Sequence, residues 1–271
     1  MTFDMNEAWR EASRMVRANA QVLAIIAGVF FFLPTFATEI FAPMPEPAEG
    51  LKPQQYMELI TTYYGDSAPL LMLVAIAQAI GVLALLALLS DRRPTVGEAL
   101  KTGAASLLPY IGAQLLIVIG IMFAAGILVA LGAATGSVPV AVVLAMMVLP
   151  VLAYVWTKMS LVAPVMVIEG IRGPIRALAR SWALTRGNSL RLFLFYCLVL
   201  FAFLVLMMLV GILSGLVLVL AMGSSTVGLT LQGAISGAIG AVMVVYFVAI
   251  MAAAHRQLAG PSTEAIADTF R

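Results

Sequence analysis

Residues 192–220 read LFLFYCLVLFAFLVLMMLVGILSGLVLVL, a run without a single charged side chain. A helix needs about 20 consecutive apolar residues to cross the hydrocarbon core of a bilayer. Because the apolar residues of this run cover every face of a helix, no side of it is suited to water. The stretch therefore predicts a transmembrane helix, and its length allows that helix to tilt strongly.

Five further runs have the same character, and breaks containing Gly, Ser or Pro separate them. The composition agrees, since 63% of the residues are hydrophobic and only 10% are charged, against about 25% charged residues in soluble domains. We expect an all-α, polytopic membrane protein, a single membrane domain over residues 1–271. The first run is expected to remain as an uncleaved helix. The five runs are residues 22–41, 70–89, 107–131, 140–160 and 229–254.

Lysine and arginine indicate the orientation, because cytoplasmic loops carry an excess of both. In this six-span layout only Lys52 falls on the outer side, in a predicted external loop at residues 42–67 that also carries acidic residues. Both termini are therefore predicted to be cytoplasmic. The acidic residues of the outer side are Glu39, Glu46, Glu49, Glu58 and Asp66. The basic residues of the inner side are Arg10, Arg14, Arg17, Arg92, Arg93, Lys101, Lys158, Arg172, Arg176, Arg180, Arg186, Arg191, Arg256 and Arg271.

Three short segments on the inner side are predicted to be interfacial helices, at residues 6–18, 95–106 and 173–185. Each precedes a pair of spans, and they begin comparably, with EAW at 7–9, EAL at 98–100 and RAL at 176–178. This similarity favours one unit, a short helix followed by a two-span hairpin, used three times. Six-span proteins pair their helices in any case. A further short helix is predicted within the external loop, where apolar residues of 56–64 fall at helical spacing.

The cytoplasmic linker between spans four and five, residues 161–191, reads LVAPVMVIEGIRGPIRALARSWALTRGNSLR. Gly173-Pro174 marks a helix start, because proline needs no hydrogen-bond partner in the first turn. Arginines then recur every four residues and share one face, beside an apolar face that ends in Trp182. This pattern is typical of an amphipathic helix lying at a membrane surface.

These arginines are the candidate functional residues. An arginine beside an anionic leaflet gains about 1 kcal/mol, and its guanidinium can hold a phosphate with paired donors. The alternatives are that the arginines only set the topology, or that they dock a membrane-protein partner or a second copy of the chain. The candidate contact residues are Arg172, Arg176, Arg180, Trp182, Arg186 and Arg191.

Few other residues could support catalysis, metal binding or a disulfide. Glu169 is the only acid of the basic stretch and is expected to pair with Arg172 or Arg176. His255 is expected to be a solvated residue at a helix end, and Cys197 a small buried residue. One cysteine and one histidine exclude an internal disulfide and a Cys-rich metal site. We therefore expect no cofactor, no metal and no catalytic residues, with Glu169 and His255 the only cytoplasmic carboxylate–histidine pair an enzyme could use.

The linker also carries a family resemblance, in APVxVIEG at residues 163–170 followed by AxxxSWxLTxG at residues 177–187. This pattern resembles the membrane-domain family of glycerophosphoryl diester phosphodiesterases and is similar to the YciC-type bacterial inner-membrane proteins. The resemblance implies a multi-pass protein of the bacterial cytoplasmic membrane. It implies no activity, because in that family the chemistry belongs to a separate barrel domain with histidines and a carboxylate metal site, which these residues do not supply.

The sequence thus favours a non-enzymatic membrane protein that organises phospholipid, chiefly anionic, or a partner protein at the cytoplasmic face. Nucleic acid is not expected as a ligand, because the basic loops lie at a membrane surface. The alternative is a transporter or channel-like permease for a small or lipidic solute. A polar stripe of Gln78, Gln114 and Gln232 meeting between the spans would favour this alternative. Small-residue stripes at 211–215 and 233–241 are expected to pack helices together within the chain, with contacts between copies of the chain as the alternative.

Overall fold

The computed structural model describes residues 2–45, 50, 52–92, 94–223 and 225–260, and within these ranges the chain is helical without strands. Six segments are long and apolar enough to span a membrane, so the predicted all-α, polytopic fold is confirmed. Arg93, Arg271, Glu46 and Glu49 lie outside the described residues. The spans are Ala20–Phe41, Pro53–Leu88, Val96–Ala134, Val138–Val167, Ser189–Met222 and Thr226–Ala259.

The spans consist of the following helices. The first contains α2 (Ala20–Ala27), a π-helical turn η1 (Gly28–Phe32) and α3 (Leu33–Phe41), and the second is α4 (Pro53–Leu88). The third is α5 (Val96–Ala134), and the fourth contains α6 (Val138–Met146), α7 (Val148–Met159) and α8 (Val162–Val167). The last two are α10 (Ser189–Met222) and α11 (Thr226–Ala259), while α1 (Met5–Ala18) and α9 (Pro174–Leu184) are short helices outside the spans.

Local sequence explains where several helices begin and end. The Asp4 side chain accepts a hydrogen bond from the Glu7 backbone amide at the start of α1, which satisfies one of the free N–H groups of the first turn. Thr95 and Glu98 form a reciprocal capping box at the start of α5. Gly223 ends α10 with a φ of 63°, a left-handed conformation that glycine adopts readily.

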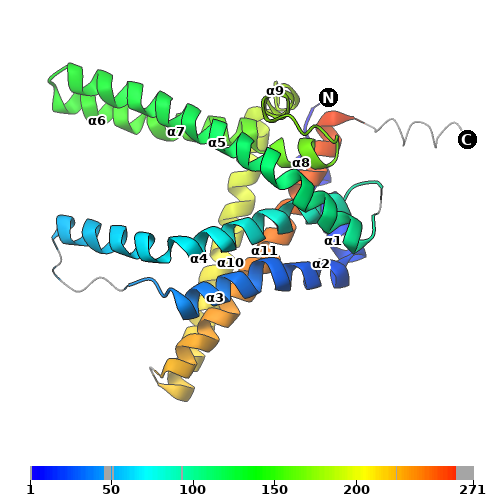
Figure 1. Ribbon diagram of the computed structural model, residues 1–271, viewed down its shortest axis with the longest axis horizontal. Coiled ribbons are helices and arrows are strands. Elements are labelled where there is room, and N and C mark those ends of the chain that lie inside the picture. Colours follow the sequence, from blue (N-terminus) through cyan, green and yellow to red (C-terminus); the bar gives the residue numbers. More distant parts are fainter. Residues whose placement is uncertain (1, 46–49, 51, 93, 224, 261–271) are drawn as a thin grey trace, which may run out of the picture.

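The packed core lies at one end of the spans, which we call the α1/α9 end. In α4 the buried residues run from Val74 to Ala87, and in α11 nearly all lie between Gly237 and His255. Figure 1 shows the helix ends drawing together at this end, whereas the α5/α6 turn, the start of α4 and the α10/α11 turn end far apart. Large apolar side chains at the separated ends, such as Phe123 and Leu220, are more than two-thirds exposed, so lipid must cover them.

The span boundaries differ most from the prediction at the starts of α4 and α5. α4 begins at Pro53, so much of the predicted loop at residues 42–67 is helical, and the predicted helix at 56–64 is part of α4. α5 begins at Val96 and includes the predicted short helix at 95–106 without a break. Gly65 and Pro69 read as breakers in the sequence, but glycine and proline are tolerated in helices that pass into a membrane. Only the first and third of the predicted short helices are separate, as α1 and α9.

Proline divides the fourth span. Pro150 and Pro164 have no N–H to donate to the carbonyls four residues earlier, those of Met146 and Ser160. α6 ends at Met146, and α7 ends at Met159, immediately before Ser160. The apolar run at residues 140–160 therefore contains two helices, and the span continues in α8.

Cys197 is not the buried residue that the sequence predicted, because it lies exposed on α10. Its neighbours Phe195, Tyr196 and Val199 are buried, so this part of α10 turns one face inward and presents Cys197 outward. An all-apolar run contains no pattern from which this rotation could be read.

Candidate functional site

Glu169 joins two distant parts of the chain at the α1/α9 end. Its carboxylate accepts a hydrogen bond from Arg180 of α9, at 2.9 Å between Nε and Oε2. The other oxygen, Oε1, lies 2.9 Å from Nε2 of His255 in α11. The exposed fractions of the side chains are 4% for His255, 20% for Glu169 and 41% for Arg180. Because Glu169 lies between α8 and α9, this cluster ties that connection to α11.

The electrostatics of the cluster favour an ionised carboxylate. Burial raises the pKa of Glu169, but the hydrogen bonds and charges of Arg180 and His255 outweigh it, so the pKa lies below its ordinary value. A carboxylate offers only acceptors, so the proton between the two side chains resides on Nε2 of His255. The other ring nitrogen, Nδ1, is buried and has no hydrogen-bond partner among the described residues.

This geometry corrects two predictions. His255 is not solvated but buried, within a stretch of α11 whose preceding residues Ala252–Ala254 are fully buried as well. Glu169 pairs with Arg180 rather than with Arg172 or Arg176. The run of three alanines before His255 was a usable signal, because small residues mark places where helices approach closely.

The two residues after His255 hold further segments, so we call residues 255–257 the α11 clamp. Arg256 bonds Glu11 of α1 at 3.1 Å, Asp91 after α4 at 2.8 Å and the carbonyl of Leu89 at 2.6 Å. Gln257 exchanges two hydrogen bonds with the Asp4 backbone. Consecutive residues of one helix end therefore fix α1, the α4–α5 connection and the α8–α9 connection, an arrangement that the sequence analysis missed.

The structure separates the candidate arginines into two groups. Arg180 belongs to the Glu169 cluster, whereas the other four are exposed and make no ion pair within the described part of the chain. These four, which we call the α9 arginines, flank or lie on α9 and the start of α10. They are Arg172, Arg176, Arg186 and Arg191.

Trp182 is half-exposed and forms an aromatic corner with α7. Its ring meets that of Tyr154 edge to face, with 5.6 Å between centroids, and Nζ of Lys158 lies 5.1 Å from the Trp182 ring centroid. Lys158, one of the basic residues predicted on the inner side, is buried over these rings. Ser181 reinforces the corner by donating a hydrogen bond to the Lys158 carbonyl at 2.7 Å. This packing fixes the orientation of α9 and of Arg176, which α9 carries.

The three glutamines that would favour a permease do not meet. Gln78 bonds Thr35, Gln114 bonds the Tyr110 hydroxyl, and Gln232 bonds the Gly211 carbonyl. A cavity of about 560 Å³ does lie between the spans, but it is lined mainly by apolar side chains from α4, α5, α7, α8, α10 and α11. Of the three glutamines, only Gln114 contributes to its wall.

The small-residue stripes have different surroundings. Gly233 lies directly against the carboxyl group of Glu39, and Gly237 against the ring of Phe32, while Ala241 is buried. This stripe therefore packs α11 onto the first span within one chain. Gly211 instead has no neighbour within 4 Å of where a Cβ would lie, so the stripe at 211–215 faces outward at that position.

Comparison with known protein families identifies a match over most of the chain. A family model described as a domain of unknown function, DUF7847, matches residues 4–258. These residues include α1, the first five spans, all of the sixth span except Ala259, and the whole α11 clamp. No curated protein and no solved structure matches the chain.

Proposed function

Because the chain belongs to the DUF7847 family, a domain of unknown function, we propose a function from its own geometry. The protein is a non-enzymatic, multi-pass membrane protein that organises anionic phospholipid at the cytoplasmic face of the bacterial inner membrane. We also propose kinship with the membrane domain of glycerophosphoryl diester phosphodiesterases, on the pattern at residues 163–187.

The observation that carries this proposal is the exposed, uncompensated charge of the α9 arginines. An arginine held by a carboxylate is already satisfied, as Arg180 is by Glu169, whereas a free guanidinium retains its donors for a phosphate. Trp182 and Lys158 hold α9, which carries Arg176 and is flanked by Arg172 and Arg186. Each arginine near an anionic leaflet contributes about 1 kcal/mol, so the four together favour an anionic membrane surface by several kcal/mol.

Native mass spectrometry of the full-length protein with dioleoyl-phosphatidylglycerol and dioleoyl-phosphatidylcholine tests the proposal. The variant R176Q/R186Q removes two of the free charges and leaves Arg180 in its cluster. We expect a loss of phosphatidylglycerol affinity of about 30-fold, from about 1 kcal/mol per arginine, with phosphatidylcholine binding unchanged. The control R180Q removes one positive charge from the Glu169 cluster and should reduce thermal stability more than selectivity for phosphatidylglycerol. Equal phosphatidylglycerol binding by wild type and R176Q/R186Q contradicts the proposal and leaves the α9 arginines as topology signals or as contacts for a partner protein.

A second candidate function, an enzyme acting on lipid head groups, draws on the convergence of Glu169 and His255 at 2.9 Å. A carboxylate that orients a histidine is a common general-base arrangement. Here Nε2 is occupied by the carboxylate and Nδ1 is buried, so neither nitrogen faces a substrate. We therefore assign the pair a structural role. Loss of a phosphodiesterase activity in H255A with the fold retained would favour the enzyme instead.

A further inference from the structure

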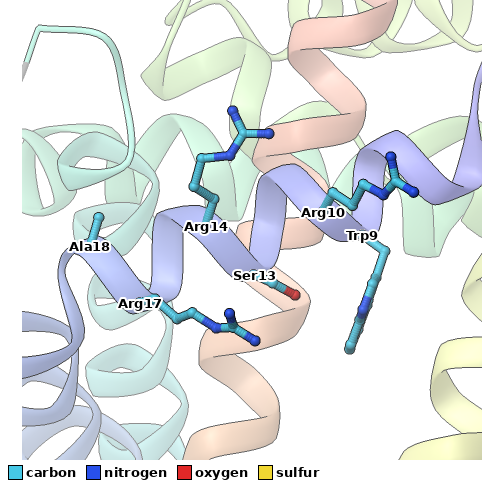
Figure 2. Close-up of a pocket in the computed structure, with 6 residues that line it drawn as sticks. All are labelled: Trp9, Arg10, Ser13, Arg14, Arg17 and Ala18. Atoms are coloured by element: carbon cyan, nitrogen blue, oxygen red, sulfur yellow. The ribbon is translucent and has the colours of Figure 1, made fainter.

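A second basic surface lies on α1, far from α9 in sequence. Arg10, Arg14 and Arg17 are all exposed, and their spacing of four and three residues places them on one face of the helix. Together with Trp9, Ser13 and Ala18 they line a hollow of about 690 Å³, which we call the α1 hollow. Figure 2 shows Ser13 in the middle of the group, with Trp9 and Arg10 toward one end of the helix and Arg17 and Ala18 toward the other.

The face of α1 opposite the hollow is packed against the rest of the protein, so the helix that forms the hollow is held in place. Ala8 and Ala12 are fully buried, and α1 packs chiefly on α11. Glu11 is bonded by Arg256 of the α11 clamp. The arginines of the hollow are therefore presented outward by a helix that is locked in rotation.

The positive charge of the hollow is largely uncompensated. Arg14 approaches Glu7 at 3.7 Å, but this pair is mostly exposed, and exposed ion pairs are weak. Arg10 and Arg17 make no ion pair among the described residues. The guanidinium groups of Arg10, Arg14 and Arg17 present N–H donors along the hollow and Ser13 adds a hydroxyl, the chemistry that binds a phosphate. The side chains of Arg17 and Ser13 point to one side of α1 and those of Arg10 and Arg14 to the other (Figure 2).

An aromatic pair places this hollow at the membrane boundary. Trp9 stacks on Tyr246 of α11, with ring centroids 6.0 Å apart and an interplanar angle of 20°, and Tyr246 belongs to a span. Tryptophan and tyrosine are enriched where a membrane meets water. A phosphate bound in the hollow would therefore have its glycerol and acyl chains beside this pair, in the lipid that surrounds α11.

We propose that the α1 hollow binds the phosphate of an anionic glycerophospholipid, at a site separate from the α9 arginines. The inference takes the class of lipid, an anionic phospholipid, from the proposed function. The residues that form the site are argued independently of it. α1 packs on α11, α10 and α2, whereas α9 packs mainly on α8, α5 and α7. The α9 and α1 sites can therefore be removed one at a time.

The experiment counts bound lipids on the full-length protein by native mass spectrometry, with phosphatidylglycerol, phosphatidylcholine or inorganic phosphate as the probe. Wild type should retain phosphatidylglycerol at two kinds of site. R10Q/R14Q/R17Q should lose one of them, with affinity reduced by about 100-fold, because each arginine contributes about 5-fold. R10K/R14K/R17K keeps the charges that set the orientation and removes the paired donors, so it should show an intermediate loss.

The variant R176Q/R186Q separates the two proposals. If R176Q/R186Q retains both sites while R10Q/R14Q/R17Q loses one, the proposed function of the α9 arginines fails and the α1 inference stands. If R176Q/R186Q loses one site while R10Q/R14Q/R17Q retains both, the α1 inference fails and the proposed function stands. Equal phosphatidylglycerol binding by wild type and R10Q/R14Q/R17Q overturns the α1 inference. Three other results would also overturn it. The first is a loss of phosphatidylcholine binding in R10Q/R14Q/R17Q equal to the loss of phosphatidylglycerol binding, and the second is displacement of the lipid by millimolar inorganic phosphate. The third is preferential retention of a polyglutamate peptide, which would assign the hollow to an acidic protein.

Discussion

His255 and Glu169 meet at 2.9 Å across 86 residues of sequence. The pair joins the end of the last span to the start of the segment that carries α9, and Arg180 closes the cluster from the other side. His255 is nearly fully buried. Removing either His255 or Glu169 would therefore leave the polar atom of the other side chain without its hydrogen-bond partner. The following predictions test this and related contacts.

Replacing Glu169 by Gln should lower the stability of the protein. The substitution removes the charge that Arg180 and His255 share, and an unsatisfied buried polar group costs about 1–3 kcal/mol. Thermal unfolding in detergent should show a clear decrease in Tm. Glu7→Gln is the matched control, because its pair with Arg14 is exposed on both sides and such pairs contribute about 0–1 kcal/mol. Equal Tm values for the two variants would contradict a structural role for Glu169.

The same cluster predicts a pH dependence. The pKa of Glu169 is lower in the folded protein than its ordinary value, so its contribution to stability is complete above the ordinary glutamate pKa, about 4.3. The contribution is lost as the pH falls below that value and through the lowered pKa of the folded state. The Tm difference between wild type and E169Q should therefore be constant near neutral pH and shrink in acid. A difference that grows below pH 4 would refute this assignment.

Arg256→Gln should loosen α1 without unfolding the spans. The substitution removes the bonds to Glu11, Asp91 and the Leu89 carbonyl, and the Glu11 carboxylate loses its partner. Hydrogen exchange measured by mass spectrometry should show faster exchange in α1 and around residues 89–91. Arg191→Gln serves as the control, because Arg191 is exposed and makes no ion pair in the described chain. Unchanged protection of α1 in R256Q would show that its apolar face alone holds it.

Two glycines of α5 offer a matched pair for the contact between α4 and α5. A Cβ at Gly103 would lie 3.0 Å from both the Ala84 amide nitrogen and the Ile80 carbonyl oxygen, which are backbone atoms. Gly103→Ala should therefore destabilise the protein by about 1–3 kcal/mol through overpacking. Gly97→Ala meets nothing within 4 Å and should leave stability unchanged or raise it by up to about 1 kcal/mol. Measured Tm values of opposite order would contradict the observed helix contact.

The sequence was sufficient for the spans because spanning length and hydrophobicity are local properties. The helix start at Pro174 was also predictable, since proline after glycine carries a local signal. The true start of α4 was missed because Gly65 and Pro69 indicate a loop in water, whereas the α4 helix continues through both. Local signals thus located most helices but not all of their ends.

The clusters at the α1/α9 end could be predicted only in part. Four of the five arginines of residues 161–191 are exposed, but the sequence offered no means of telling Arg180 apart from them. Its pairing with Glu169 depends on how α11 is rotated against α9, and no local pattern encodes that rotation. The α1 hollow was overlooked for a related reason, because Arg10, Arg14 and Arg17 were interpreted only as topology signals.

The confinement of the core to the α1/α9 end makes the two halves of the molecule mechanically unequal. In the half that contains the α11 clamp, protein touches protein, and close packing resists deformation. In the other half, the helix ends lie apart (Figure 1) and expose large apolar side chains, and the lipid chains that would cover them can rearrange. We therefore expect stretching or thinning of the bilayer to change the spacing of the hairpin tips more than the relative positions of the basic surfaces of α1 and α9.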